Sequence, residues 1–332
     1  MDVLVSGASV AGPVTAYWLR RYGFRVTVVE RAPALRKAGG HAVDLFTPAM
    51  GIVERMGLLD QVMDRRTGTE RMTVLREGAR RPVTIELTKL MGGISRRHVE
   101  IMRDDLGEIV YDATRDDVEY LFGDQVTAIG EDGEVAFAHA PPRRFDVVVG
   151  ADGLHSGVRA LRFGPEERYA TWIGAYIAVA SIPNYLGLRD QMVGVTGVNR
   201  LVGMYGGRRL PDARALFLFR PPAELHHDHR DVDAQRRVLR AQFGDLGGEV
   251  PRLLDEADRA SAFYFDSVTQ LRMSHWTHGR VALVGDAGYC PGPAVGGSTS
   301  LAVVGAYTLA GELALAEGDP GRAFPAYEAV MA

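Results

Sequence analysis

The stretch Val3-Leu-Val-Ser-Gly-Ala-Ser-Val-Ala-Gly12 decides the fold of this chain. Its first three residues form a short apolar run, which is typical of a strand buried on both faces of a parallel sheet. Gly7 and Gly12 are the outer glycines of a dinucleotide-binding fingerprint, in which the first permits a tight turn and the last lets helix and strand pack closely. Ser9 stands where the second glycine is usual. The stretch therefore predicts a strand, a glycine-rich turn and the start of a helix.

The next residues complete a strand–helix–strand unit. We expect a helix that ends near Gly23, followed by a second strand, Val26-Thr-Val-Val29, with Glu30 at its end. The N–H groups at a helix start attract a diphosphate. A carboxylate about twenty residues past the turn can bind the hydroxyls of an adenosine ribose. The unit predicts a dinucleotide site, and the alternative is a chance glycine turn in another α/β protein.

The composition narrows the class of protein. The 332 residues suggest two domains or one large one, and 46% of them are hydrophobic. A net charge of −4 without a long basic run gives no reason to expect nucleic acid. The single cysteine, Cys290, excludes an internal disulfide and a cysteine-cluster metal site, and it fits a cytoplasmic location. No signal peptide is expected, and no apolar run of about eighteen residues predicts an integral membrane segment.

Two further buried strands end in glycine–acid turns. Phe145-Asp-Val-Val-Val149 runs into Gly150-Ala-Asp-Gly153, and Val281-Ala-Leu-Val284 runs into Gly285-Asp286. Between these two strands, the sequence no longer alternates between strands and helices and instead predicts consecutive strands with isolated aromatic residues. We therefore predict an α/β fold with a Rossmann-like parallel-sheet domain and an inserted domain built on a mixed or antiparallel sheet. The first domain is assigned residues 1–66, 95–164 and 276–332, and the inserted substrate domain residues 67–94 and 165–275.

Four segments have apolar residues at helical spacing. The pattern predicts helices over 48–63, over 95–106 with Ser95 as the N-cap, over 232–243 and over 300–315.

Three motifs together resemble those of the class A flavin-dependent monooxygenases. They are Gly7–Gly12 with Glu30, Asp152-Gly-Leu-His-Ser-Gly-Val-Arg159, and Arg280-Val-Ala-Leu-Val-Gly-Asp286 followed by Pro291-Gly-Pro-Ala-Val-Gly-Gly297. The family consists of p-hydroxybenzoate hydroxylase-like aromatic hydroxylases and includes tetracycline-inactivating monooxygenases. The resemblance runs from residue 2 to about residue 330. The family normally continues for several tens of residues after the Tyr327-Glu328 helix, whereas this sequence ends at Ala332.

The resemblance implies a flavoprotein monooxygenase, an oxidoreductase with bound FAD, NAD(P)H as transient reductant and O2 as co-substrate. The reduced flavin would form a hydroperoxide that passes one oxygen atom to an aromatic carbon. No catalytic residue is assigned, because the flavin carries the chemistry. Arg96 matches the family's arginine at the start of the helix after the first inserted strands. The resemblance places the cofactor against Gly7, Ser9, Val10, Ala11, Gly12, Glu30, Arg31, Arg96, Val126, Asp152, Gly153, Gly285, Asp286, Pro293, Gly296, Gly297 and Ser298.

The predicted substrate is a small aromatic or phenolic molecule, polycyclic or antibiotic-like. Candidate pocket residues are His41, Met204, Phe217 and Phe219. His226-His-Asp-His229 is interpreted as a solvated loop, not a metal site, and no metal is predicted. The sequence leaves open the substrate, NADH versus NADPH, and the oligomeric state.

The sequence also bears on two other functions. A catalytically silent flavin-binding regulator is suggested by Gly297-Ser298, which stands where Gln-Gly is more usual. A flavin halogenase is disfavoured, because Trp18, Trp172 and Trp276 do not form the Trp-x-Trp-x-Ile-Pro pattern of that branch.

Overall fold

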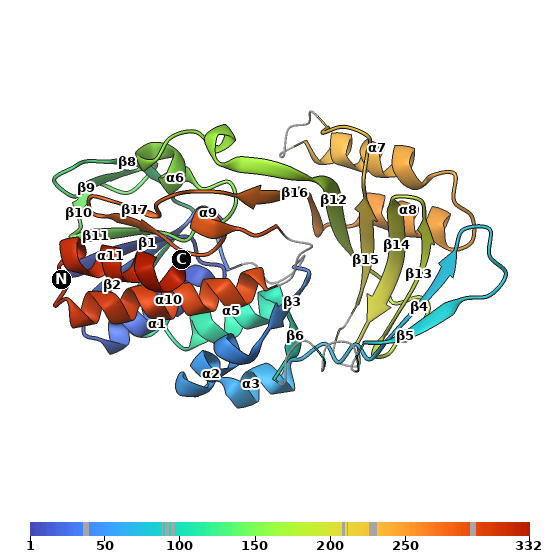
Figure 1. The fold of residues 1–332 in the computed structure, drawn as a ribbon, viewed down its shortest axis with the longest axis horizontal. Helices are drawn as coiled ribbons and strands as arrows, with labels where there is room; N and C mark the ends of the chain where they lie inside the picture. Colours follow the sequence, from blue (N-terminus) through green and yellow to red (C-terminus); the bar gives the residue numbers. More distant parts are fainter. Residues whose placement is uncertain are drawn as a thin grey trace.

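A mostly parallel sheet of six strands forms the core of the part of the molecule that contains both chain ends (Figure 1). The computed structural model describes residues 1–332 except 36–39, 88, 90–92, 94–96, 208–209, 211, 226–230 and 293–296. The strand order is β17 (Thr277–His278), β18 (Val281–Leu283), β11 (Val147–Gly150), β1 (Asp2–Ser6), β2 (Arg25–Glu30) and β7 (Glu119–Phe122). Only the pairing of β17 with β18 is antiparallel among these strands. The expected Rossmann-like parallel sheet is confirmed.

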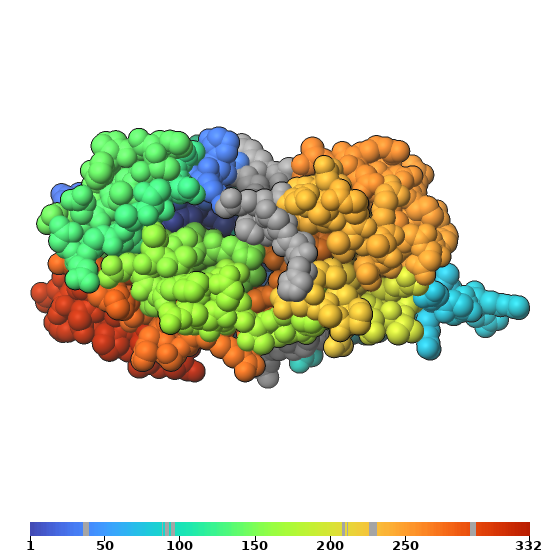
Figure 2. All heavy atoms as spheres, turned by 90° about the horizontal axis from the view of Figure 1, so that it is seen from above, coloured from blue at the N-terminus to red at the C-terminus, as the bar shows by residue number. Residues whose placement is uncertain are grey.

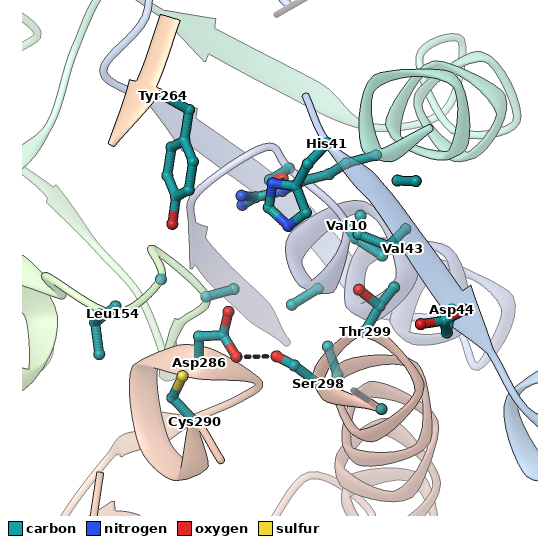
Figure 3. A pocket seen from close by; sticks show the side chains of 18 residues that line it. Val10, His41, Val43, Asp44, Leu154, Tyr264, Asp286, Cys290, Ser298 and Thr299 are labelled. Carbon is teal, nitrogen blue, oxygen red and sulfur yellow. Dashed lines mark hydrogen bonds between the residues drawn. The ribbon is translucent and has the colours of Figure 1, made fainter. Parts of the chain in front are cut away.

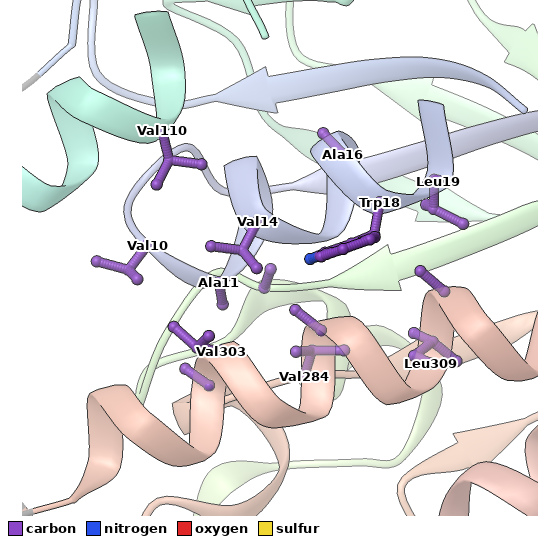
Figure 4. Packing of buried hydrophobic residues seen from close by; sticks show 14 of the residues in the cluster. Val10, Ala11, Val14, Ala16, Trp18, Leu19, Val110, Val284, Val303 and Leu309 are labelled. Atoms are coloured by element: carbon purple, nitrogen blue, oxygen red, sulfur yellow. The ribbon is translucent and has the colours of Figure 1, made fainter. Parts of the chain in front are cut away.

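Helices cover one face of this sheet, whereas a small three-stranded sheet (residues 126–144) and the short helix at residues 157–162 cover the other. α1 and α10 pack against each other through Val14, Val303 and Leu309, all of which are buried (Figure 4). Among the described residues, the helices of this part are α1 (Ala11–Arg21), α2 (Thr47–Arg55), α3 (Leu59–Asp64), α5 (Arg103–Asp112), α6 (Gly157–Arg162), α9 (Asp286–Tyr289), α10 (Ser298–Leu315) and α11 (Pro320–Met331).

Helix α10 confirms the helix predicted over 300–315 and begins two residues earlier. By length and composition alone it could cross a membrane, with a mean hydropathy of 1.2 over its 18 residues. However, it packs against α1, α2 and α11, and Ala306, Leu309 and Leu313 are completely buried. Its apolar surface is therefore used in the core of the protein, as in many core helices.

A second, mixed sheet of seven strands forms the other part of the molecule (Figure 1). Its order is β16 (Phe263–Leu271), β12 (Ala170–Ile182), β15 (Ala213–Phe219), β14 (Arg200–Gly206), β13 (Gln191–Gly197), β4 (Arg71–Arg76) and β5 (Val83–Glu86). β13 and β4 are parallel, and the other pairs are antiparallel. Helices α7 (Val232–Phe243) and α8 (Val250–Arg259) cover one face and bury an aromatic and aliphatic core. The helix predicted over 232–243 is confirmed.

Three smaller elements complete the fold of the described chain, and the first of them packs on the six-stranded sheet through Val135 and Phe137. They are a three-stranded sheet of β10 (Arg143–Arg144), β9 (Glu134–Phe137) and β8 (Val126–Ile129), a 3-10 turn (Glu166–Arg168), and a two-stranded sheet of β3 (Ala42–Leu45) and β6 (Val99–Met102). The long strands β12 and β16 run from the seven-stranded sheet toward the six-stranded one (Figure 1).

Two helix predictions were wrong in their bounds. The helix predicted over 48–63 is two helices, α2 and α3, because Gly57 has φ +73° and ends the first. The helix predicted over 95–106 is a strand followed by a helix. Val99-Glu-Ile-Met102 pairs with β3, and the helix begins only at Arg103. Val99 and Ile101 are buried with the half-buried Glu100 between them, but Met102 is buried as well, so the alternation is too short to stand out from the helical spacing that follows.

The core under the seven-stranded sheet gives the first testable prediction. Phe243 of α7 is fully buried and meets Phe217 and Phe219 edge to face, with ring centroids 5.3 and 5.9 Å apart. Phe243→Ala should lower the free energy of unfolding by about 3–5 kcal/mol, because it removes a large side chain from a packed core. Urea unfolding measures this. The control Val198→Ala removes a side chain that is 84% exposed and should stay within about 0.5 kcal/mol of wild type. Equal effects of the two changes would contradict the packing described.

Candidate active site

A long groove follows the carboxyl ends of β1, β2, β11 and β18. It consists of a larger cavity with an empty volume of about 1660 Å³ and a smaller one of about 900 Å³. Glu30, Asp152 and Asp286, one from each glycine–acid motif, all line the larger cavity. The two cavities share Ser9, Arg103, Ala151, Gly153, Leu154, Tyr264 and Asp286. In Figure 2 the dark-blue N-terminal residues lie recessed between the surrounding segments. The three separated motifs therefore meet at one site.

The start of α1 faces the middle of the groove. The first N–H groups of a helix have no partner within the helix, so they are available to an anion. Gly12 lets this helix approach the preceding turn, because an added Cβ would lie 1.8 Å from the Gly7 carbonyl oxygen. Gly7 has φ +107°, and a Cβ there would meet the Ala151 carbonyl oxygen at 2.5 Å. Both outer glycines of the fingerprint are thus required by close backbone approach.

Glu30 lies at one end of the groove. Its two carboxylate oxygens accept hydrogen bonds from the Ala8 and Ala32 N–H groups, each at 2.8 Å. Arg31 and Val126 line the same end. The carboxylate is held rigidly at the tip of β2, where it can accept further hydrogen bonds from a ligand.

Asp152 supports the wall of the groove. Its carboxylate accepts hydrogen bonds from the Ser156 hydroxyl (2.5 Å) and the Val158 N–H (3.1 Å) at the start of α6, and burial raises its pKa. The buried Arg159 donates to the Leu154 and Ala287 carbonyl oxygens and forms an ion pair with Glu166. Gly153, with φ +83° and open space at its Cβ position, presents bare backbone to the groove.

The opposite end of the groove is formed by the start of α10. Asp286 accepts a hydrogen bond from the Ser298 hydroxyl (Figure 3). Gly297 precedes the helix with φ +80°, and Gly285 packs where a Cβ would lie 3.1 Å from Ala302. Cys290 also lines this end, and burial raises the pKa of its thiol, which favours the unreactive form.

Most predicted cofactor residues are found at the groove. Those that line it are Gly7, Ser9, Val10, Ala11, Glu30, Arg31, Val126, Asp152, Gly153, Asp286, Gly297 and Ser298. Gly12 and Gly285 lie beneath its wall. Arg96, Pro293, Gly296 and the segment 226–229 lie outside the described residues.

Three of the four substrate-pocket candidates lie elsewhere. Met204, Phe217 and Phe219 are at most 1% exposed and pack in the core beneath α7 and α8. Side chains of a strand alternate between its two faces, so their neighbours Tyr205, Arg214 and Leu216 face the other side. His41 does line the smaller cavity. The alternation was visible in the sequence, but nothing there showed which face the helices cover.

Two groove residues were missed. Arg103 is the arginine that begins the helix after the first inserted strands, and its Nε donates to the Ser9 hydroxyl at 3.0 Å. The role predicted for Arg96 stays a prediction, because that residue lies outside the described part of the chain. Tyr264 of β16 lines both cavities, and burial raises the pKa of its hydroxyl, which stays protonated. The signal in the sequence that could have identified Arg103 is the strand Val99–Met102 directly before it. Tyr264 lies on a strand for which the sequence does not show which residues face the groove.

A charged cluster joins the Asp152 loop to β16 at the rim of the groove. The His155 Nδ1 lies 2.9 Å from a Glu166 oxygen, and its Nε2 lies 3.5 Å from an Asp266 oxygen. Hydrogen bonds to Asp266 and Glu166 raise the pKa of His155 to about 10. The imidazole is therefore protonated at neutral pH and bridges two carboxylates from different parts of the fold.

The fold and the groove define a class of FAD-binding oxidoreductases. The family described as FAD binding domain matches residues 1–323, so the chain belongs to that family. The groove fits FAD, because it offers free helix N–H groups, bare glycine backbone and an anchored carboxylate at one end. Within the family the chain is a flavin-dependent monooxygenase.

Named relatives are similar over the whole chain. A Flavin-dependent monooxygenase of Legionella longbeachae serogroup 1 (strain NSW150) is 40% identical and aligns over 100% of this chain and 85% of its own length. The protein Rv1260 of Mycobacterium tuberculosis (strain ATCC 25618 / H37Rv) is 43% identical over 98% of this chain and 88% of its own. The crystal structure of tetracycline destructase Tet(51) superposes with a TM-score of 0.89 at 39% identity, covering 99% of this chain and 86% of that one.

The close approach at Gly12 gives a second prediction. Gly12→Ala should lower the free energy of unfolding by about 1–3 kcal/mol and weaken FAD binding, because the new methyl group pushes α1 away from the turn. Thermal unfolding and FAD fluorescence titration measure the two effects. The control Gly51→Ala lies in α2 with nothing within 4 Å of its Cβ position and should be neutral or slightly stabilising. Unchanged FAD affinity in the Gly12 variant would contradict this account.

The His155 cluster gives a third prediction, on pH dependence. Because the pKa of His155 is raised to about 10, its contribution to stability is complete below its unfolded value near 6.5 and is lost as the pH rises through about 10. The stability difference between wild type and His155→Gln should therefore be largest near about pH 6 and vanish above about pH 10. Urea unfolding at several pH values measures it. Asp266→Asn should reduce the same difference, and a difference that grows with pH would refute the assignment.

Proposed function

We propose that this enzyme hydroxylates a phenolic or polycyclic aromatic molecule, with NAD(P)H as transient reductant and O2 as co-substrate. The single observation that carries the proposal is the continuous groove lined by Glu30, Asp152 and Asp286. Its length suits an extended dinucleotide, and its far end opens beside a second sheet. The similarity to tetracycline destructase Tet(51) supports a polycyclic substrate. We also propose a cytoplasmic location, which a single cysteine fits.

Each part of the groove would have its own task. Glu30 would hold the adenosine ribose, and the start of α1 with Arg103 would hold the diphosphate. Asp286, Gly297 and Ser298 would lie near the flavin ring. When bound, FAD would supply the redox chemistry, accepting a hydride from NAD(P)H and activating O2 for transfer of one oxygen atom. The chain itself orients the ligands and excludes water.

We assign substrate binding to the space between the groove and the seven-stranded sheet. The face of that sheet away from α7 and α8 carries Met192 and Tyr205, which are buried together with Met102 of β6. Aromatic and thioether groups of this kind suit a flat apolar ligand. The insertion of residues 67–94 and 165–275 would thus form the substrate domain.

The test is oxygen incorporation by the purified holoenzyme. With FAD, NAD(P)H and tetracycline under ¹⁸O2, we expect one labelled oxygen atom in the product and NAD(P)H consumption that the substrate accelerates. Mass spectrometry of the product detects the labelled oxygen, and stopped-flow absorbance follows NAD(P)H consumption. Label from H2¹⁸O in place of ¹⁸O2 would exclude a monooxygenase reaction. Tight FAD binding without reduction by NADH or NADPH across a panel of phenols would favour a silent flavin-binding regulator.

A further inference from the structure

The short segment Gly40–Ala42 is fixed from several sides between the groove and the seven-stranded sheet. The Gly40 N–H donates to an Asp104 carboxylate oxygen at 2.6 Å, and the Gly40 carbonyl oxygen accepts from Arg214 Nε at 3.4 Å. The His41 carbonyl oxygen accepts from the Arg103 N–H at 3.0 Å. The Ala42 N–H donates to the Tyr205 hydroxyl at 3.3 Å. Four hydrogen bonds from α5, β14 and β15 thus hold three residues.

This anchoring gives the His41 side chain one orientation. The imidazole lies in the smaller cavity beside Tyr264, with ring centroids 5.3 Å apart and planes tilted by 33° (Figure 3). The part of its surface that stays accessible opens into that cavity. Among the described residues, no hydrogen-bond partner is found for either ring nitrogen. The half-buried ring therefore lines the cavity with its hydrogen-bonding groups available to a ligand, which would take the place of water there.

The charge state of His41 restricts the ligand. Burial, and then the nearby Arg103 cation, lower the pKa of His41 to about 4, so the ring is neutral near pH 7. A neutral imidazole has one N–H donor and one nitrogen acceptor. Other charged side chains close to the segment are already paired, Arg214 with Asp212 and Asp104 with the Gly40 N–H. The ring therefore suits a neutral group such as a hydroxyl, which can both donate and accept.

We propose that His41 is a substrate-recognition residue that hydrogen-bonds the hydroxyl of a phenolic or enolic substrate. The inference rests on the proposed function and specifies the chemical group that the site selects. One placement favours the substrate over the cofactor as the partner. His41 shares the smaller cavity with Gly297 and Ser298, which are assigned to the flavin ring, but its segment is bonded to β14 and β15 of the seven-stranded sheet, the side assigned to the substrate. Tyr264 lies beside it and provides an aromatic contact for the ring that carries the hydroxyl.

The test is equilibrium binding to the oxidised holoenzyme without NAD(P)H, so no turnover is required. The probes are 2-naphthol and 2-methoxynaphthalene, which have the same ring system but differ in the ability to donate a hydrogen bond. Perturbation of the bound flavin's absorbance reports binding. We expect wild type to prefer 2-naphthol by roughly tenfold, as one buried hydrogen bond predicts. His41→Phe, which keeps the ring contact with Tyr264, should remove the preference while FAD affinity stays within about twofold.

Two variants complete the design. His41→Asn keeps a donor and an acceptor and should recover part of the preference. The control His278→Phe changes an exposed histidine at the edge strand β17 and should leave the preference unchanged.

Four results would overturn the inference. Two concern His41→Phe: the preference for 2-naphthol survives, or the variant loses affinity for FAD and for both naphthalenes together. The other two are a His41→Asn variant that recovers no preference and a wild type without any preference. These results concern only the recognition of the hydroxyl. Failure of ¹⁸O2 incorporation would instead reject the proposed reaction, so the two failures can be told apart.

Discussion

The structure depends on the close approach of α1 to the turn that precedes it. The Gly12 backbone comes so near the Gly7 carbonyl oxygen that even a methyl group would not fit. Only with this approach can the first turn of the helix aim its free N–H groups into the groove at the carboxyl end of β1. The same end of the sheet receives the loops after β11 and β18, since parallel strands end on one side. The geometry of one glycine contact therefore fixes where three distant motifs converge.

The second constraint is the connection between the two sheets. The long strands β12 and β16 carry the chain from one sheet to the other, and the ion pairs of His155 with Glu166 and Asp266 fasten β16 to the Asp152 loop. On the other side of the groove, Arg214 and Tyr205 of the seven-stranded sheet bond to Gly40 and to Ala42, the first residue of β3. The groove is thus bounded by polar contacts from both parts of the fold. A ligand in it would touch residues whose positions depend on each sheet.

Much of the fold could be predicted from sequence, because local patterns encoded it directly. The buried apolar runs before Gly7, Gly150 and Gly285 identified three strands of the parallel sheet and the groove at their ends. Failures occurred where the pattern was ambiguous. The segment 95–106 contains a four-residue strand too short for its period to outweigh the helical spacing after it, so the start of the helix at Arg103 was not predicted.

The substrate side was harder to predict for a different reason. Met204, Phe217 and Phe219 are apolar and lie on strands, as expected, but the choice between the two faces of a sheet is made by helices far away in sequence. α7 and α8 cover one face, and only their packing shows that alternate residues such as Tyr205 and Leu216 belong to the other. A single sequence shows which residues of a strand share a face, but it does not show which of the two faces the helices cover.

The groove contains three carboxylates although it is assigned to an anionic ligand, and hydrogen bonds from the chain to these carboxylates make the two compatible. Three carboxylates, Glu30, Asp152 and Asp286, surround a space assigned to a ligand with a negative diphosphate, and uncompensated they would repel it. Each accepts hydrogen bonds from the chain itself, from backbone N–H groups, serine hydroxyls or both. Arg103, bonded to the Ser9 hydroxyl, supplies a positive charge to both cavities. The acids can therefore shape the walls and anchor neutral hydroxyl groups, while the diphosphate meets N–H groups and a cation in the middle of the groove.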